Sequence, residues 1–353
     1  MFNRPRRPTR QVTVGMVKIG GDAPVSVQSM TTTDTRDIDA TVKQIHQLQE
    51  AGCDIIRVAV LDRKAAESLA EIKRQISIPL VADIHFHYRL ALIAAEQGVD
   101  KIRTNPGNIG DDVKMETVVA ACKDRHIPIR IGVNTGSLEN DLVHQYGRYS
   151  PEALVESAMR KVRLLEEMGF EDIVISLKSS EVAGMVEAYR LMSQKVGYPL
   201  HLGVTEAGPL QAGTIKSSVA FGLLLHEGIG DTIRVSLSAD PIEEVKVGKK
   251  ILQSLGLFSN MPELVSCPTC GRLQTDLFGL IGRVEKVLEG IHKPIKVAVM
   301  GCNVNGPGEV SGADIGVVGG ADYLSLVRDG KVIAKLPPEQ LEEALLRELE
   351  RFR

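Results

Sequence analysis

"PLVADIHF" occupies residues 79–86 and "DKIRTNP" occupies residues 100–106, and a helix-like stretch lies between them. Both runs are short, both contain branched apolar residues, and both end in polar or charged side chains. A strand, a helix and a second strand in this order form a unit whose two strands pair in parallel. The fold therefore depends on how often this unit recurs along the chain.

Six further strand-like runs continue the pattern. They are "VSVQSM" (25–30), "DIIRVAV" (54–60), "PIRIGVN" (128–134), "DIVISLK" (172–178), "LHLGVTE" (200–206) and "TIRVSLS" (232–238). Amphipathic stretches separate the runs, and their ends carry helix signals: Ser150 and Asp240, each before a proline, suit N-caps, and Gly52, Gly98 and Gly169 suit C′ positions. Eight units predict a closed (β/α)₈ TIM barrel, and the hairpin-like run 12–21 is placed to plug its bottom.

The pattern changes near residue 257. Residues 258–353 contain three of the five cysteines, a predicted helix at 275–290, strand-like runs at 296–301 and 314–320, a hairpin-like run and a charged terminal helix. We therefore expect two domains, a TIM barrel over 1–257 and a small α/β domain over 258–353.

Composition restricts the class of protein. The chain has 353 residues, 43% hydrophobic and 25% charged, and no apolar run of the length that spans a bilayer. Its basic start is followed by no apolar segment, so no secretion signal is predicted and a cytoplasmic location is expected. The net charge of −3 does not favour a nucleic-acid-binding protein.

Polar side chains gather late in the predicted strands, where TIM barrels build their active sites, and those within one strand share one face. They are Arg57, Asp83, His85, Arg103, Asn105, Arg130, Asn134, Ser176, Lys178, Glu206, Arg234 and Ser236. Five are cations that would repel one another unless an anion bound among them. No GxxxxGK[ST] or GxGxxG motif follows a strand, so we predict a small phosphorylated substrate rather than a nucleotide. Glu206 is a candidate proton donor or acceptor, and Asp83 is placed to fix the tautomer of His85.

Three thiols suggest a metal centre in the second domain. "SCPTCG" (266–271) supplies Cys267 and Cys270, and "VMGCNVNGPGE" (299–309) supplies Cys302. Pairs of this spacing hold zinc as well as iron–sulfur clusters, and a zinc site stays open as an alternative. The turn at residues 306–308 can return Glu309 as a fourth, more readily displaced ligand, which would leave one iron accessible to a substrate. Cys53 and Cys122 are expected to be small buried apolar residues.

Taken together, the barrel, its cationic strand ends and the motif "CPTC…GCNVNGPGE" closely resemble the 4-hydroxy-3-methylbut-2-enyl diphosphate synthase family of the methylerythritol phosphate route to isoprenoids, over essentially the whole chain. The resemblance implies a [4Fe-4S] cluster on Cys267, Cys270, Cys302 and Glu309. It implies reductive ring opening of 2-C-methyl-D-erythritol 2,4-cyclodiphosphate, with single electrons from flavodoxin or ferredoxin. It also implies that Arg57, Arg103, Arg130, Lys178, Arg234 and Ser236 bind the diphosphate, that Asp83, His85 and Asn134 make polar substrate contacts, and that Glu206 is the acid.

Two other classes of protein remain as alternatives. One is a phosphosugar aldolase in which Lys178 forms a Schiff base beside a structural zinc module. The other is a zinc-binding interaction module attached to an inactive barrel, which leaves the cationic strand ends without a purpose. For the iron–sulfur enzyme we expect a head-to-tail homodimer. The last barrel helix ends at the bottom face and the linker at 257–262 is short, so each cluster domain would cap the barrel of its partner.

Overall fold

The computed structural model describes residues 5–104, 112–303, 308 and 310–352. The chain forms two compact units, Met1–Leu257 and Phe258–Arg353, each with its own core. In the described part of the chain, no helix combines the length and the apolarity that crossing a membrane requires.

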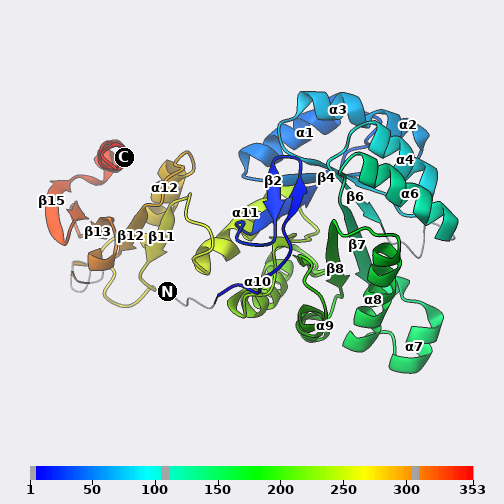
Figure 1. The fold of residues 1–353 in the computed structure, drawn as a ribbon. Coiled ribbons are helices and arrows are strands. Elements are labelled where there is room, and N and C mark those ends of the chain that lie inside the picture. The colour runs from blue at the N-terminus through cyan, green and yellow to red at the C-terminus, as the bar shows by residue number, and fades with distance from the viewer. Residues whose placement is uncertain (1–4, 105–111, 304–307, 309, 353) are drawn as a thin grey trace. The chain divides into compact units, whose positions relative to one another are not determined.

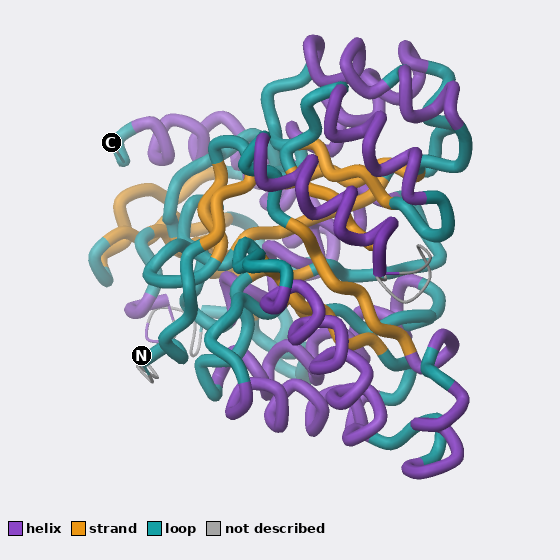
Figure 2. The backbone as a smooth tube through the Cα atoms, turned by 45° about the vertical axis from the view of Figure 1, so that its right-hand side comes forward, coloured by secondary structure: helices purple, strands orange, loops and turns teal. Residues whose placement is uncertain are grey.

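The first unit contains a barrel of eight parallel strands surrounded by helices (Figures 1 and 2). The strands are β3 (Ser26–Met30), β4 (Ile55–Ala59), β5 (Leu80–Asp83), β6 (Lys101–Thr104), β7 (Ile129–Asn134), β8 (Ile173–Lys178), β9 (His201–Leu202) and β10 (Thr232–Ile233). Their order in the sheet is β8-β7-β6-β5-β4-β3-β10-β9, and a bridge between Ile175 and Leu200 joins the two ends. The prediction of a TIM barrel is thereby confirmed.

The helices lie between successive strands and cover the outside of the barrel. They are α1 (Ile38–Glu50), α2 (Arg63–Glu67), α3 (Leu69–Gln75), α4 (Tyr88–Glu96), α6 (Asp112–Asp124), α7 (Asn140–Tyr146), α8 (Pro151–Glu167), α9 (Val182–Lys195), α10 (Leu210–His226) and α11 (Pro241–Ser254). Ser150 and Asp240 accept hydrogen bonds from the first-turn N–H groups of α8 and α11, as predicted for N-caps. Gly52, Gly98 and Gly169 have φ of +96°, +77° and +66°, the left-handed conformation of a C′ residue.

An N-terminal hairpin plugs the bottom of the barrel. It consists of the antiparallel strands β1 (Val12–Val14) and β2 (Val17–Ile19). Its buried side chains form one apolar cluster with residues at the starts of three barrel strands, Ile55, Val81 and Val174. The lower end of the barrel is therefore closed by apolar packing, and polar side chains higher in the barrel are cut off from water on that side.

In its described residues, the second unit contains a mixed five-stranded sheet and the helices α12 and α14. Its elements are β11 (Glu263–Ser266), α12 (Leu277–Leu288), β12 (Lys296–Met300), β13 (Ile315–Gly319), β14 (Leu324–Arg328), β15 (Lys331–Leu336) and α14 (Leu341–Glu350). The strands lie in the order β11-β12-β13-β14-β15; the first three are parallel and the last two pairs are antiparallel. Leucines of α12 and α14 pack with valines of β12 and β13 in one apolar core, which fixes both helices to the sheet.

Candidate active site

A buried ion-pair network links the ends of β4, β5 and β6. Asp83 accepts a hydrogen bond of 3.0 Å from the Arg103 guanidinium, and its other oxygen lies 3.7 Å from Nε of Arg57. Burial alone would raise the pKa of Asp83, but the charges of Arg57 and Arg103 hold it well below its usual value. Burial lowers the pKa of Arg57 to about 9, and Asp83 partly offsets that effect. The carboxylate thus orients two guanidinium groups that face the barrel axis.

His85 joins this network through Arg103 rather than through Asp83. Nη1 of Arg103 lies 2.8 Å from Nε2 of His85, whereas the nearest oxygen of Asp83 is 3.6 Å from that nitrogen. Since a guanidinium only donates hydrogen bonds, Nε2 of His85 is the acceptor in this contact. In the structure, Arg103 rather than Asp83 lies at hydrogen-bonding distance from His85.

Two glycines make room for the cations. A Cβ at Gly132 would lie 2.6 Å from Nε of Arg103, and a Cβ at Gly203 would lie 2.9 Å from Nζ of Lys178. Both distances are shorter than any non-bonded contact allows, so each long side chain occupies space that only a glycine leaves open. These two glycines leave space for the two cationic groups.

Arg130 is enclosed by the barrel. It is fully buried, and none of its three guanidinium nitrogens has a hydrogen-bond partner among the residues that the structure describes. Burial, reinforced by the charges of Arg57 and Arg103, lowers its pKa well below the usual value. A buried guanidinium without a partner is costly, and an anion bound beside it would offset that cost.

The opposite wall holds Arg234, whose Nη2 lies 3.4 Å from Oε2 of Glu244 on α11. The same carboxylate accepts hydrogen bonds from the Leu237 N–H at 2.9 Å and the Ser29 hydroxyl at 3.3 Å. The sequence reasoning missed Glu244. Its signal is an acid at a buried position of an amphipathic helix, among Pro241, Val245 and Gly248.

The remaining predicted residues are placed as follows. Asn134 ends β7 opposite Lys178, which ends β8, and Ser236 lies three residues beyond β10. Glu206 is exposed in the loop after β9 and has φ of +53°, a strained conformation for a side chain of its size. Asn105 lies outside the described residues.

A deeper polar layer was not predicted. Lys101 and His201 are fully buried, and neither the Lys101 amine nor either ring nitrogen of His201 has a hydrogen-bond partner in the described ranges. Gln28 on β3 is also buried, and neither polar atom of its side chain has a hydrogen-bond partner in the described ranges. Lys101 precedes Arg103 by two residues and so shares its inward face. The two-residue spacing from Arg103 could have indicated that Lys101 points inward. We did not predict this because the first residue of a strand usually reaches solvent.

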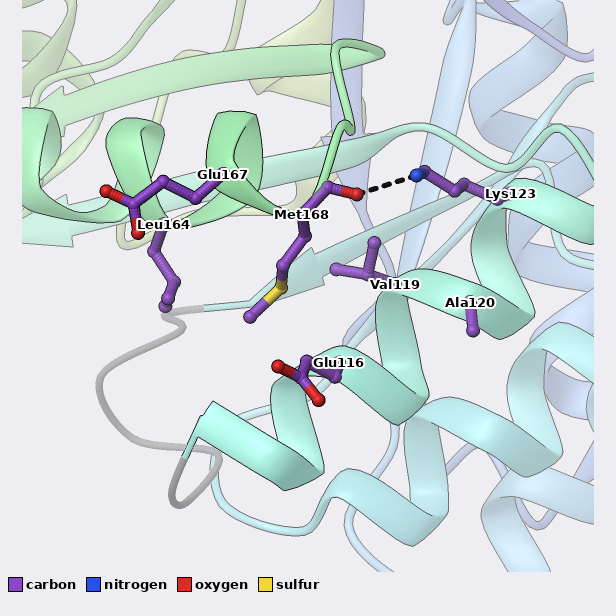
Figure 3. Close-up of a pocket in the computed structure, with 7 residues that line it drawn as sticks. All are labelled: Glu116, Val119, Ala120, Lys123, Leu164, Glu167 and Met168. Atoms are coloured by element: carbon purple, nitrogen blue, oxygen red, sulfur yellow. Dashed lines mark hydrogen bonds between the residues drawn. The ribbon is translucent and has the colours of Figure 1, made fainter.

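A groove of about 440 Å³ lies on the outside of the barrel between α6 and the end of α8 (Figure 3). Its lining residues are Glu116, Val119, Ala120, Lys123, Leu164, Glu167 and Met168. Nζ of Lys123 donates a hydrogen bond of 2.6 Å to the carbonyl of Met168, which satisfies a carbonyl at the end of α8. The groove contains none of the strand-end side chains and belongs to helix packing.

In the second unit, two thiols lie at the carboxyl ends of neighbouring parallel strands. Cys267 follows β11 directly, Cys302 comes two residues after β12, and Ser266 pairs with Val299 in the sheet. The N–H of Gly301 donates to Sγ of Cys267 at 3.3 Å. The two motifs therefore meet at one edge of the sheet, although they are separated by more than thirty residues in sequence.

The loop between the motifs is hydrogen-bonded to the end of β12 through Gln274. The N–H of Gln274 donates to the carbonyl of Gly301 at 2.9 Å, and the Gln274 side chain accepts from the N–H of Asn303 at 3.0 Å. Cys270 is exposed in this loop. Among the described residues, no three His, Cys, Asp or Glu side chains converge on one metal ion, and Glu309 lies outside that part of the chain.

Cys53 and Cys122 are buried, as predicted. Burial raises the pKa of both thiols to about 12, so neither is a thiolate at neutral pH.

Comparison with protein families matches both units. Residues 9–249 match the family model described as the GcpE TIM-barrel domain, and residues 263–351 match the GcpE protein C-terminal domain. Among curated relatives, 4-hydroxy-3-methylbut-2-en-1-yl diphosphate synthase (flavodoxin) of Caldanaerobacter subterraneus subsp. tengcongensis is 58% identical over 347 residues, covering 98% of each chain. The enzyme of the same name from Clostridium perfringens is 58% identical over 345 residues, covering 98% of this chain and 99% of its own.

Solved structures resemble the barrel at low sequence identity. The dihydropteroate synthase of Yersinia pestis has a TM-score of 0.51 at 12% identity, covering 70% of this chain and 97% of its own. The truncated 3-deoxy-D-arabino-heptulosonate 7-phosphate synthase of Thermotoga maritima has a TM-score of 0.50 at 16% identity, covering 71% of this chain and 94% of its own. These structures support the barrel fold alone, whereas the two domain matches and the full-length relatives identify the lineage: the chain belongs to the GcpE family.

Proposed function

We propose that the chain converts 2-C-methyl-D-erythritol 2,4-cyclodiphosphate into 4-hydroxy-3-methylbut-2-enyl diphosphate, with reductive opening of the ring and loss of water. The observation that carries the proposal is the buried, unpartnered guanidinium of Arg130 among the other strand-end cations, in a chain 58% identical over its length to enzymes of this name. A diphosphate supplies the negative charge that this interior lacks.

The residues divide into three roles. The diphosphate is bound by Arg57, Arg103, Arg130, Lys178, Arg234 and Ser236. The rest of the substrate is contacted by Asp83, His85, Asn105 and Asn134. Planar guanidinium groups suit phosphate oxygens, and the Asp83 and Glu244 carboxylates hold three of them in fixed orientations. Glu206 donates a proton to the leaving oxygen, which becomes water.

The second domain is proposed to hold a [4Fe-4S] cluster on Cys267, Cys270, Cys302 and Glu309, and the barrel is the substrate-binding domain. Two observations support this assignment: Cys267 and Cys302 follow the neighbouring parallel strands β11 and β12, and the N–H of Gly301 donates to the sulfur of Cys267. N–H groups directed at cysteine sulfur stabilise the thiolate ligands of iron–sulfur clusters. When bound, the cluster supplies electrons one at a time.

Reduced flavodoxin or ferredoxin is the proposed electron donor, and flavodoxin stands in the names of the relatives. Both are soluble electron carriers, which agrees with a cytoplasmic enzyme. The alternatives, an aldolase with a Schiff base on Lys178 and a zinc module, would leave the purified protein colourless. Visible absorption of anaerobically purified protein, together with iron and sulfide analysis, tests this choice. Zinc in place of iron and sulfide would refute the proposal.

A head-to-tail homodimer completes the site in our proposal, with the cluster domain of one chain serving the barrel of the other. It is supported by the short linker and by the separation of the two sets of ligands into different domains. A Lys178→Ala chain mixed with a Cys302→Ala chain should recover activity, because one site of each mixed dimer retains both functional groups. If confirmed heterodimers stay inactive, the site is completed within one chain.

A further inference from the structure

A buried amine lies below the strand-end cations. Lys101 is the first residue of β6 and pairs in register with Val81, which belongs to the apolar plug at the bottom of the barrel. Its side chain shares the inward face of Arg103. The amine is fully buried, and no described residue accepts a hydrogen bond from it. The hairpin plug excludes water from the bottom of the barrel, and no described carboxylate lies at hydrogen-bonding distance from the amine. A positive charge on Lys101 therefore has no compensating partner.

The groups that act on Lys101 are cationic or already engaged. Arg130 from β7 and Arg57 from β4 repel a charge on the amine. Asp100 attracts it, but its carboxylate already contacts Lys73 and accepts from the N–H of Leu80 at 2.8 Å. Burial, followed by the two guanidiniums, lowers the pKa of Lys101 well below its usual value.

His201 is the neighbouring titratable group. Burial, followed by the charges of Arg130 and Arg57, lowers its pKa well below the usual value, so its ring is neutral near pH 7. Burial also lowers the pKa of Lys178. Lys178, however, ends β8 and retains 7% exposure, so its amine can contact a bound diphosphate directly. Lys101 differs from Lys178 because its amine is fully buried and has no hydrogen-bond partner among the described residues.

Binding of an anion would favour the protonated form of Lys101. A diphosphate placed against Arg130 and Arg57 offsets the two charges that repel a proton on Lys101. We propose that Lys101 is the proton acceptor of the diphosphate site: it is an uncharged amine in the unliganded barrel and takes up a proton from the solvent when a diphosphate binds. The inference rests on the proposed function for the existence of the diphosphate site, and it adds that binding is linked to protonation.

The linkage suits the proposed reaction. A cyclic diphosphate dianion takes in two electrons and one proton and yields a linear diphosphate trianion and one water. The diphosphate thus gains one negative charge when the ring opens. A protonated Lys101 beneath it balances that charge, while Glu206 on the opposite, exposed side handles the proton that leaves in water. Lys101 is in this account a positioning and charge-balancing residue, since nothing places it against the reacting carbon.

Calorimetry with a ligand that cannot itself titrate tests the proposal. Methanedisulfonate has the shape of a diphosphate and two permanent charges, so any proton taken up on binding goes to the protein. Titration at pH 7.5 in buffers of different ionisation enthalpy should show uptake approaching one proton per wild-type barrel. Lys101→Met should show none, and Lys101→Arg should bind the anion without uptake because arginine is already charged. Lys123→Met, a change at the outer groove, should behave as wild type.

Each outcome either supports or contradicts proton uptake by Lys101. No uptake by the wild type, or undiminished uptake by Lys101→Met, overturns the proposal, and the second result would assign the acceptor to Lys178. If the variants do not fold, the wild type still tests the idea. Its affinity for methanedisulfonate should weaken by up to tenfold per pH unit above neutrality, and constant affinity would contradict it. If neither methanedisulfonate nor inorganic pyrophosphate binds at all, the diphosphate site of the proposed function is itself wrong.

Discussion

The Arg103 guanidinium lies over Gly132, so that a Cβ at residue 132 would be 2.6 Å from Nε. Because Asp83 and His85 also contact Arg103, this glycine fixes one edge of a network that spans β5, β6 and β7. The shape of the candidate site is therefore set as much by the absence of a side chain as by the cations themselves.

Gly132→Ala should displace the Arg103 guanidinium and break its contacts with Asp83 and His85. We expect affinity for inorganic pyrophosphate to fall roughly tenfold, which is the loss of one charge-assisted hydrogen bond. Gly222→Ala is the matched control, because a Cβ there meets no atom within 4 Å and alanine favours the helix. Wild-type affinity in the Gly132 variant would show that Arg103 is not held by this contact.

Arg130→Met should have different effects on the stability of the protein and on its affinity for pyrophosphate. Removing a buried guanidinium without a partner should leave the free energy of unfolding unchanged or raise it by ~1–4 kcal/mol. Affinity for pyrophosphate should fall about ten- to hundredfold, as for Lys178→Ala, and the visible spectrum of the cluster should not change. A variant that loses stability but keeps its affinity would mean that Arg130 is structural. Loss of the cluster would contradict the division of roles between the domains.

Lys101→Met should stabilise the unliganded protein most at low pH. The pKa of Lys101 is lower in the folded than in the unfolded chain, so the unfolded chain binds more protons between the two values, and wild-type stability rises with pH there. Methionine does not titrate, so the stability of the variant lacks this dependence on pH. The advantage of the variant should therefore shrink between pH 6 and pH 9, as measured by urea unfolding. An advantage that grows with pH would have the wrong sign for a buried amine.

Glu309→Ala should assemble a labile cluster and turn over little substrate, since three thiolates remain and one iron loses its protein ligand. Glu309→Cys should keep the cluster and block the accessible position, because a thiolate is displaced less readily than a carboxylate. Anaerobic absorption spectra and activity measure both effects. Full activity in the cysteine variant would refute the displaceable ligand.

The barrel strands were predictable because short runs rich in branched apolar residues recur eight times and are separated by amphipathic helical stretches. The eight predicted runs each contain a strand, but the predicted run 200–206 is regular only at His201–Leu202 and the run 232–238 only at Thr232–Ile233. In the first of these, Glu206 has a left-handed backbone conformation that does not continue a strand. β11 (Glu263–Ser266) was missed because it lies at the edge of its sheet and is largely exposed, so it has no buried face to reveal it.

The deep layer was not predictable in the same way. A lysine at the start of a strand, such as Lys101, usually reaches solvent, and only the hairpin below the barrel closes that route. Glu244, in the first turn of α11, has the position of an acid that complements a helix N-terminus. Its contact with Arg234 depends on how the helix packs against the barrel, which periodicity does not specify.

The most direct test is turnover of the proposed substrate. Protein prepared without oxygen and shown to contain iron and sulfide should convert 2-C-methyl-D-erythritol 2,4-cyclodiphosphate when reduced flavodoxin is supplied. Phosphorus NMR should show the two signals of the cyclic diphosphate replaced by those of a linear diphosphate. An unchanged spectrum from protein that contains the cluster and binds pyrophosphate would contradict the proposed reaction.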